Sequence, residues 1–286
     1  MKKIIYFIEF VFVYILFIFF KLLGYRISSN LGYLIGKIFG PMFRSKKLIV
    51  DNLKKSNISI KQNHIEVASN VLGNYGRIFS EYPFLKSFRK GKLNEFIEIN
   101  GKNYLENILK EKKRVVFVSG HFNNFELMAM QLEKLGIELS AIYRPLNNIF
   151  LNKIMEKIRK NYICKNQIKK GMAGTRQIIK NLKKGSSVAL MIDQRVREGS
   201  KVNFFGNLAT TTTIPAQLIK KYKCELVPIY IERKDKYYFK MHISKPINVS
   251  SKKSTEEITL FLNSVLEKMI LKNPEQWIWT HDRWKK

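Results

Sequence analysis

The chain has 286 residues, of which 45% are apolar, and a net charge of +30 from 52 basic and 22 acidic residues. This apolar fraction is enough to bury a sizeable core and excludes a disordered chain. The charge favours anionic partners, although a general preference for Lys, Ile and Asn explains it equally well. The basic residues are scattered and no zinc-finger or RNP-type motif is present, which argues against nucleic acid.

The chain begins with an apolar segment. Residues Ile4 to Phe20 are apolar or aromatic apart from Glu9, and with Leu22 and Leu23 the segment approaches the about 20 residues that span a bilayer. A signal peptide would end in a small-residue cleavage site, which is absent here. A buried core helix is the other alternative, but an N-terminal helix that is apolar on all faces usually faces lipid. We therefore predict an uncleaved transmembrane anchor at 1–23. Basic residues crowd its carboxyl-terminal flank, so the positive-inside rule places the rest of the chain in the cytoplasm.

A second apolar stretch, residues 31–43, is interrupted by three glycines and Pro41. It is too short to span a bilayer, which favours a membrane-interfacial segment or a helix of the body that packs near the membrane. We predict a single domain over 24–286, because no internal repeat or linker is visible. The two cysteines, Cys164 and Cys224, provide neither a disulfide framework nor metal-ligand spacing, so we expect no metal site.

Further along the chain, apolar runs alternate with amphipathic stretches, which predict buried strands and helices respectively. In chain order, we expect a helix at 64–81, strands at 94–100 and 114–119, a helix at 124–135, a strand at 137–143, helices at 148–160 and 175–184, a strand at 187–193, a helix at 213–222, a strand at 225–232 with a hairpin partner at 236–243, and a helix at 255–271. This alternation predicts an α/β fold with a mixed, largely parallel central sheet flanked by helices and preceded by the membrane-anchor helix.

His121 occupies a position suited to catalysis. It follows the predicted strand at 114–119 and precedes the predicted helix at 124–135, at the sheet edge where α/β proteins bind ligands. An imidazole can take the proton of a hydroxyl group as that hydroxyl attacks a thioester. A carboxylate on the other ring nitrogen would hold the imidazole in the correct tautomer, and free N–H groups at the helix start could stabilise an oxyanion.

Glu126 is the candidate for that carboxylate. Five residues along a continuous helix would separate the side chains of His121 and Glu126 by about 140°, so they meet only if His121 precedes the helix. Asn123 or Asn124 is a suitable N-cap for such a helix. With no protein nucleophile in this arrangement, acyl transfer would be direct. The alternative from spacing alone is a strand-end histidine beside a solvated glutamate.

Residues 119–126, SGHFNNFE, resemble the active-site block of the lysophospholipid acyltransferase superfamily, and more narrowly that of the lipid A biosynthesis acyltransferases. Four further blocks resemble the same family in the same order, namely 143–148 (YRPLNN), 193–194 (DQ), 202–211 (VNFFGNLATT) and 274–285 (PEQWIWTHDRWK). The resemblance covers essentially the whole chain, including the apolar segment at its start.

The resemblance implies a bacterial inner-membrane enzyme with its catalytic domain on the cytoplasmic side. It would move a fatty acyl chain from acyl carrier protein to a hydroxyl of a lipid A precursor, without a cofactor, during lipopolysaccharide biosynthesis. Its partners would be acyl carrier protein, the precursor and the anionic lipids of the inner membrane, with no nucleic acid. His121 would be the general base and Glu126 would orient it.

The same resemblance places Arg144, Asp193 and Gln194 in acceptor-binding blocks. A surface ion pair is the alternative for Arg144, and a strand-end cap is the alternative for Asp193. Many family members carry an arginine between the 143–148 block and Asp193, where this sequence has Lys169 and Lys170. Lys170 is therefore the candidate phosphate ligand, unless backbone N–H groups of the glycine-containing turn after it serve instead.

Two features favour the lipid A branch. The glycerophospholipid branch usually has Asp in place of Glu126 and a Pro-Glu-Gly-Thr block further on, and neither occurs here. Two alternative functions are acylation of another anionic glycolipid or lysophospholipid, and a non-catalytic basic protein that binds membranes or nucleic acid. Replacing His121 distinguishes the enzyme from the non-catalytic protein, because a protein that only binds would keep its binding without His121.

Overall fold

The computed structural model describes residues 1–250 and 252–285. The first part of the chain is helical and comprises α1 (Lys2–Leu23), α2 (Tyr25–Phe43), α3 (Lys46–Ser56), α4 (His64–Glu81), the 3-10 turn η1 (Tyr82–Phe84) and α5 (Leu85–Arg89). Among the described residues, α1 is the one helix long and apolar enough to cross a membrane.

An α/β body follows. It comprises η2 (Asn94–Phe96), β1 (Ile97–Asn100), α6 (Lys102–Lys110), β2 (Val115–Ser119), α7 (Glu126–Lys134), β3 (Leu139–Tyr143), α8 (Ile149–Ile158), the π-helical turn η3 (Arg159–Ile163), β4 (Asn166–Lys169), α9 (Met172–Lys183), β5 (Ser187–Met191), β6 (Ser200–Phe204), β7 (Asn207–Thr211), α10 (Ile214–Tyr222), β8 (Glu225–Lys234), β9 (Tyr238–Ile243), α11 (Thr255–Lys272) and η4 (Pro274–Gln276).

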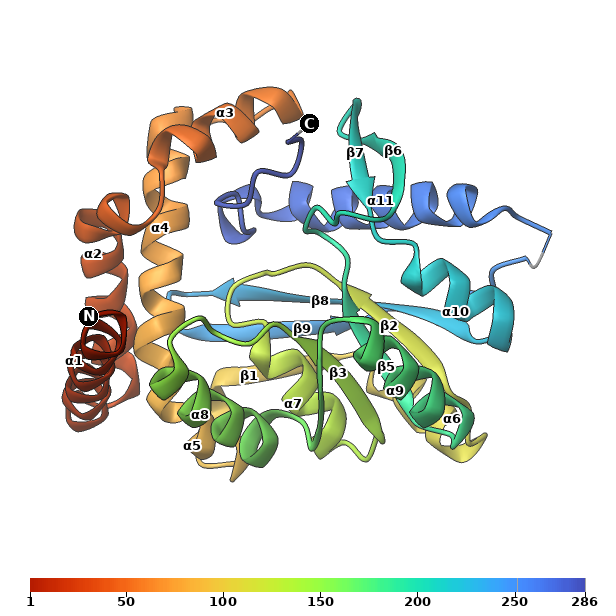
Figure 1. The fold of residues 1–286 in the computed structure, drawn as a ribbon, viewed down its shortest axis with the longest axis horizontal. Coiled ribbons are helices and arrows are strands. Elements are labelled where there is room, and N and C mark those ends of the chain that lie inside the picture. The colour runs from red at the N-terminus through yellow and green to blue at the C-terminus, as the bar shows by residue number, and fades with distance from the viewer. Residues whose placement is uncertain (251, 286) are drawn as a thin grey trace.

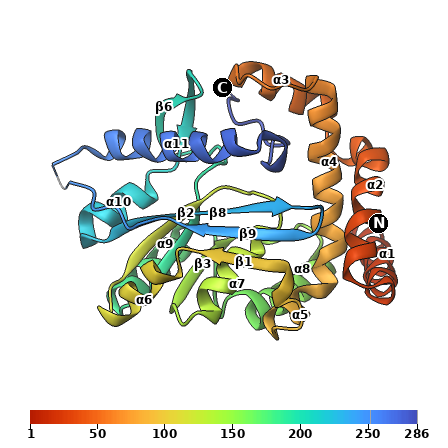
Figure 2. The ribbon, with the colours of Figure 1, turned by 180° about the vertical axis from the view of Figure 1, so that it is seen from behind.

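Seven of these strands form one sheet in the order β1-β9-β8-β2-β5-β3-β4. Neighbouring strands are parallel except β8 and β9, which form an antiparallel hairpin. The α11 helix lies on one side of the sheet, and α7 and α8 lie on the other (Figures 1 and 2). The prediction of a mixed, largely parallel α/β sheet is confirmed, as is the hairpin over the last two strands.

Every residue of β2 is buried, which accounts for its unbroken apolar sequence. Such a strand needs cover on both faces, because parallel sheets are packed by helices on each side. Beyond the short 3-10 and π turns, the elements that the sequence pattern did not predict are α3, α5, α6, β4 and the separate β6–β7 hairpin. The last two are short and carry many polar residues, so their apolar periodicity is weak.

The stretch at 31–43 lies inside the longer helix α2, which packs on α4. The packing is unusually close, because a Cβ on Gly76 would overlap with the carbonyl oxygen of Gly32, and a Cβ on Gly36 would overlap with that of Leu72. The glycines that interrupt the apolar stretch are thus the surface by which α2 is attached to α4.

Replacing Gly76 with alanine should loosen this attachment, since overpacking costs about 1–3 kcal/mol. We expect a lower midpoint of thermal unfolding, followed by circular dichroism. Gly40→Ala is the matched control, because its Cβ would meet only the Leu72 side chain, at 3.0 Å, and alanine also favours the helix. Equal midpoints for the two variants would contradict the close packing of the backbones.

Candidate active site

The register between β2 and β5 brings His121 and Asp193 together. The two strands are parallel neighbours with Ser119 opposite Met191, and the amide of Ile192 continues the ladder by donating to the carbonyl of Ser119 at 2.9 Å. His121 and Asp193 each follow their strand by two residues. They therefore leave the sheet at the same carboxyl edge, side by side.

Asp193 contacts both the ring and the backbone of His121. Its Oδ1 lies 2.8 Å from His121 Nδ1, and its Oδ2 accepts the backbone N–H of His121 at 2.6 Å. The indole of Trp277 also donates to Oδ2, at 2.9 Å. A carboxylate at Nδ1 favours the tautomer that carries its proton there, which leaves Nε2 as a proton acceptor.

Burial and charge oppose each other in this pair. Burial lowers the pKa of His121, but the attraction of the Asp193 carboxylate and its hydrogen bond outweigh burial, so the pKa lies above its ordinary value. Burial likewise raises the pKa of Asp193, while His121 and the Trp277 indole lower it, with a net decrease. Asp193 is fully buried and the His121 side chain is 20% exposed, so the ring remains reachable from outside.

Glu126 has different partners from those expected. Its Oε1 accepts hydrogen bonds from Nε and NH2 of Arg159, at 2.9 and 2.7 Å, and from the hydroxyl of Tyr82, at 2.5 Å. The predicted pairing of His121 with Glu126 is thus corrected, because the carboxylate on the ring is that of Asp193. The physical reason is that Glu126 begins α7 and extends toward η1 and η3, whereas His121 precedes the helix beside β5.

Arg159 is the site residue that the sequence reasoning missed. It begins the π-helical turn η3, is only 15% exposed at its side chain, and lies with its guanidinium 5.7 Å from the ring centre of Tyr143. It also lies between the 143–148 block and Asp193, the interval in which the sequence predicts Lys170 as the phosphate ligand. The neighbouring sequence does not distinguish Arg159 from other basic residues, because it lies between Lys157 and Lys160 in an ordinary amphipathic stretch.

The loop between β2 and α7 is held from two sides. Asn123 has a left-handed backbone with φ 43°, and both its backbone N–H and its side-chain amide donate to Gln276, at 3.1 and 2.7 Å. Asn124 donates to the fully buried Glu81 at 3.1 Å. Arg233 binds Glu81 with two hydrogen bonds, at 2.7 and 3.1 Å. Neither asparagine acts as the predicted N-cap, because Phe125 precedes α7 without a side-chain cap.

The remaining predicted site residues lie along the same edge of the sheet. Arg144 follows β3 and Lys170 follows β4, and these strands pair with Tyr143 opposite Lys169. Both side chains are exposed, and Gln194 beside Asp193 is half-buried. With strands about 4.8 Å apart, Arg144 leaves the sheet roughly 10 Å and Lys170 roughly 15 Å from His121.

A small pocket opens beside His121. Its volume is about 20 Å³, and its walls include Val71, Ile78, Phe125 and Trp277. It can hold about one water molecule. An acyl chain therefore needs more room than the pocket offers in this conformation.

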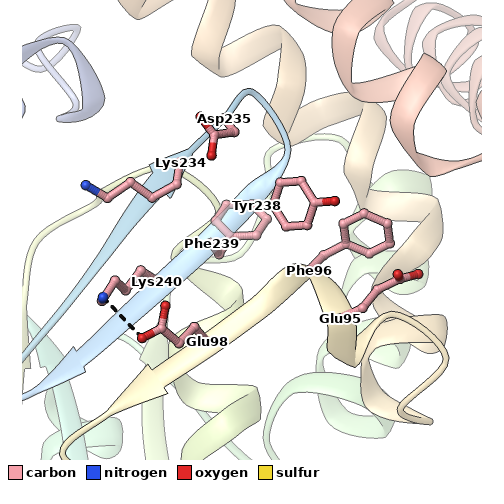
Figure 3. Close-up of a pocket in the computed structure, with 8 residues that line it drawn as sticks. All are labelled: Glu95, Phe96, Glu98, Lys234, Asp235, Tyr238, Phe239 and Lys240. Carbon is pink, nitrogen blue, oxygen red and sulfur yellow. Dashed lines mark ion pairs between the residues drawn. The ribbon is translucent and has the colours of Figure 1, made fainter.

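A larger hollow of about 390 Å³ lies at the turn between β8 and β9 (Figure 3). In the sheet, β8 separates β9 from β2, the strand that precedes His121. Phe96, Tyr238 and an ion pair between Lys240 and Glu98 at 3.1 Å contribute to its lining. The hollow contains none of the predicted site residues, so we assign the chemistry to the edge that carries His121.

Replacing Asp193 with asparagine should lower the pKa of His121, because the charge that opposes the effect of burial is lost. The pKa can be followed by NMR titration of the imidazole, since the chain has only four histidines. Glu126→Gln is the matched control and should lower the pKa less, because Glu126 contributes less to it than Asp193. A larger decrease in the Glu126 variant would restore Glu126 as the main partner.

Comparison with known proteins identifies the family of the chain. Residues 1–286 match the bacterial lipid A biosynthesis acyltransferase family. The lipid A biosynthesis palmitoleoyltransferase of Escherichia coli (strain K12) is 24% identical over 271 residues, covering 92% of this chain and 86% of that protein. The lipid A biosynthesis lauroyltransferase of the same strain is 28% identical over 202 residues, covering 68% of this chain and 63% of that protein. The chain therefore belongs to the bacterial lipid A biosynthesis acyltransferase family.

Proposed function

We propose that this enzyme transfers a fatty acyl chain from acyl carrier protein directly to a hydroxyl of a lipid A precursor, with His121 as general base. The observation that carries the proposal is the contact of His121 Nδ1 with buried Asp193, at 2.8 Å. That contact leaves Nε2 to accept a proton. In this proposal Asp193 orients His121, and Glu126 supports the site through Arg159.

The proposed reaction needs no covalent enzyme intermediate. The acceptor hydroxyl loses its proton to His121 Nε2 while its oxygen attacks the thioester carbonyl carbon. The tetrahedral intermediate then expels the thiolate of the carrier, which takes the proton from the imidazolium, so that an ester and a thiol are formed. The N–H groups of His121, Phe122 and Asn123 are already bonded within the protein, so the oxyanion needs other donors.

The positions of Arg144 and Lys170 favour an anionic acceptor. Both are exposed cations at the edge that carries His121, at separations of about two and three strand spacings. A phosphorylated glycolipid of that length could place a hydroxyl at His121 and a phosphate at one of these side chains. Gln194 is a candidate for a neutral hydrogen bond to the same acceptor.

We further propose that the enzyme works at the cytoplasmic face of the bacterial inner membrane. The basic residues around α1 and α2 would attract the enzyme to the anionic lipids of that face. The net charge of +30 would attract an acidic carrier protein, a phosphorylated acceptor and anionic lipids. No cofactor is required by this chemistry.

The function can be tested with the purified enzyme, a panel of acyl carrier protein thioesters and a tetra-acylated lipid A precursor, read by mass spectrometry. We expect one added acyl chain. His121→Ala should lower kcat by about 10²–10⁴-fold, the range for loss of a general base, whereas His64→Ala at the start of α4 should leave it unchanged. No product with any donor, or product only with lysophospholipid acceptors, would contradict the proposed acceptor.

The pH dependence should follow His121. Because its pKa is raised, kcat/KM should increase with pH through that raised value, as the base form is populated. In Asp193→Asn this increase should move to lower pH, while the plateau falls by up to about 10⁴-fold because the tautomer is no longer held. A fall without a shift of the profile would indicate that Asp193 supports the fold alone.

Loss of a phosphate ligand should weaken acceptor binding more than turnover. We expect Arg144→Ala and Lys170→Ala to raise KM for the precursor about 10-fold or more, as for a charged hydrogen bond of about 1.5–3 kcal/mol, with a smaller change in kcat. Arg176→Ala, on the exposed side of α9, is the matched control. An unchanged KM in one of the two variants would remove that residue from the acceptor site.

A further inference from the structure

The large apolar side chains that remain exposed are concentrated in α1 and α2. Both views place these helices next to each other and against α4, at one outer end of the molecule (Figures 1 and 2). We call their outward surface the helical wall. Its apolar side chains include Ile8, Phe12 and Phe19 from α1 and Leu34, Ile38 and Met42 from α2.

The amino-terminal half of α1 is attached to the body. Glu9, the one acidic residue in this helix, accepts a hydrogen bond from Asn148 at 2.9 Å. The same amide donates to the carbonyl of Tyr6, at 2.8 Å. One turn further along, the ring of Phe10 lies 6.1 Å from that of Phe150 in α8. Glu9 is exposed but hydrogen-bonded to the body, and this contact and the Phe10–Phe150 contact attach this half of α1 to the segment at the start of α8.

The carboxyl-terminal half of α1 is attached as well. The ring of Phe17 is stacked on that of Tyr82, with 6.3 Å between the ring centres. Lys21 donates to the hydroxyl of Ser87 at 3.2 Å and to the carbonyl of Pro83 at 3.3 Å. One side of α1 therefore follows the body over most of its length, which is about 33 Å for 22 residues.

This attachment is incompatible with a helix that crosses a bilayer alone. Within the hydrocarbon region, backbone N–H and C=O groups outside helices find no hydrogen-bond partners in lipid. The neighbours of a spanning helix are therefore lipid or other spanning segments. In Figure 1, α1 is viewed nearly along its axis, whereas the axis of α2 is vertical in the picture. The two helices of the wall therefore run in different directions. If α1 crossed the bilayer, the turn η1 and the start of α8 beside it would lie at membrane depth.

The charge around the wall suits an anionic lipid surface. Residues 1–50 contain eight basic side chains and one acidic side chain, Glu9. Eight positive charges against one negative charge make this segment attractive to an anionic surface. Basic residues near the surface of an anionic membrane each contribute about 1 kcal/mol of attraction.

We propose that α1 and α2 lie together in one leaflet of an anionic membrane, with α1 parallel to the bilayer plane and not across it. The helical wall is then the membrane-binding surface of the enzyme. Phe17 of α1 contacts Tyr82, which binds Glu126, so the site lies directly behind this surface. This proposal concerns the position of the protein in the membrane and does not depend on the proposed acyl transfer.

The depth of each helix can be measured by electron paramagnetic resonance. Nitroxides would be attached to single cysteines at Ile5, Phe12, Phe19 and Ile38 of the full chain, reconstituted in vesicles of phosphatidylglycerol and phosphatidylethanolamine. Leu271→Cys in α11, exposed but outside the wall, is the matched control. The native Cys164 and Cys224 are buried, so the wild-type chain supplies the background.

We expect similar immersion in lipid at all four wall positions and an aqueous environment at Leu271. A spanning α1 would instead make Phe12 much deeper than Ile5 and Phe19 and leave Ile38 in water, which would overturn the proposal. An aqueous environment at all four positions would overturn it as well, because the wall would then not meet lipid.

The sidedness of α1 supplies a second measurement. We would replace Lys2, the first residue of α1, and Lys47, which follows α2, with cysteine in separate variants, because both side chains are exposed. In membranes from cells that make the protein, a membrane-impermeant maleimide should label both cysteines from the same side. Labelling from opposite sides would refute the in-plane placement.

Discussion

A single buried carboxylate, that of Asp193, holds the candidate active site together. A buried charge is costly unless it is paired and hydrogen-bonded. Asp193 is satisfied by the ring and backbone N–H of His121 and by the indole of Trp277. These donors come from the end of β2 and from the segment that follows α11. The β2–β5 register, the loop after β2 and the carboxyl-terminal segment must therefore all be correct before His121 has the tautomer of a base.

A second carboxylate, Glu126, has a separate environment. Arg159 and Tyr82 bind it, and Tyr82 in turn is stacked on Phe17 of α1. One carboxylate thus acts on the imidazole, while the other connects α7 to the part of the molecule that carries the apolar helices. This difference between Asp193 and Glu126 follows a general rule, by which neighbouring carboxyl groups take different roles when their surroundings differ. It also connects the candidate site to α1 through Tyr82 and Phe17.

Much of the fold could be predicted from local pattern. The unbroken apolar run of β2 and the hairpin of β8 and β9 were recognisable because buried strands leave a strong signal. The position of His121 at a carboxyl strand end followed from the same pattern. The weaker signals of β4 and of the β6–β7 hairpin were missed, because short polar strands take their stability from neighbours and not from their own periodicity.

The sequence by itself determined the class of fold, the apolar start of the chain and the residue type able to act as base, because composition and periodicity depend only on neighbours along the chain. Only the tertiary structure decided which carboxylate meets His121. Glu126 is five residues away but faces Arg159, whereas Asp193, 72 residues away, is brought into contact by the register of two parallel strands. Strand pairing is a long-range choice, so no local spacing could reveal it. The same holds for α1, whose length and composition permit a membrane span and whose contacts with Asn148 and Tyr82 are visible only in the tertiary structure.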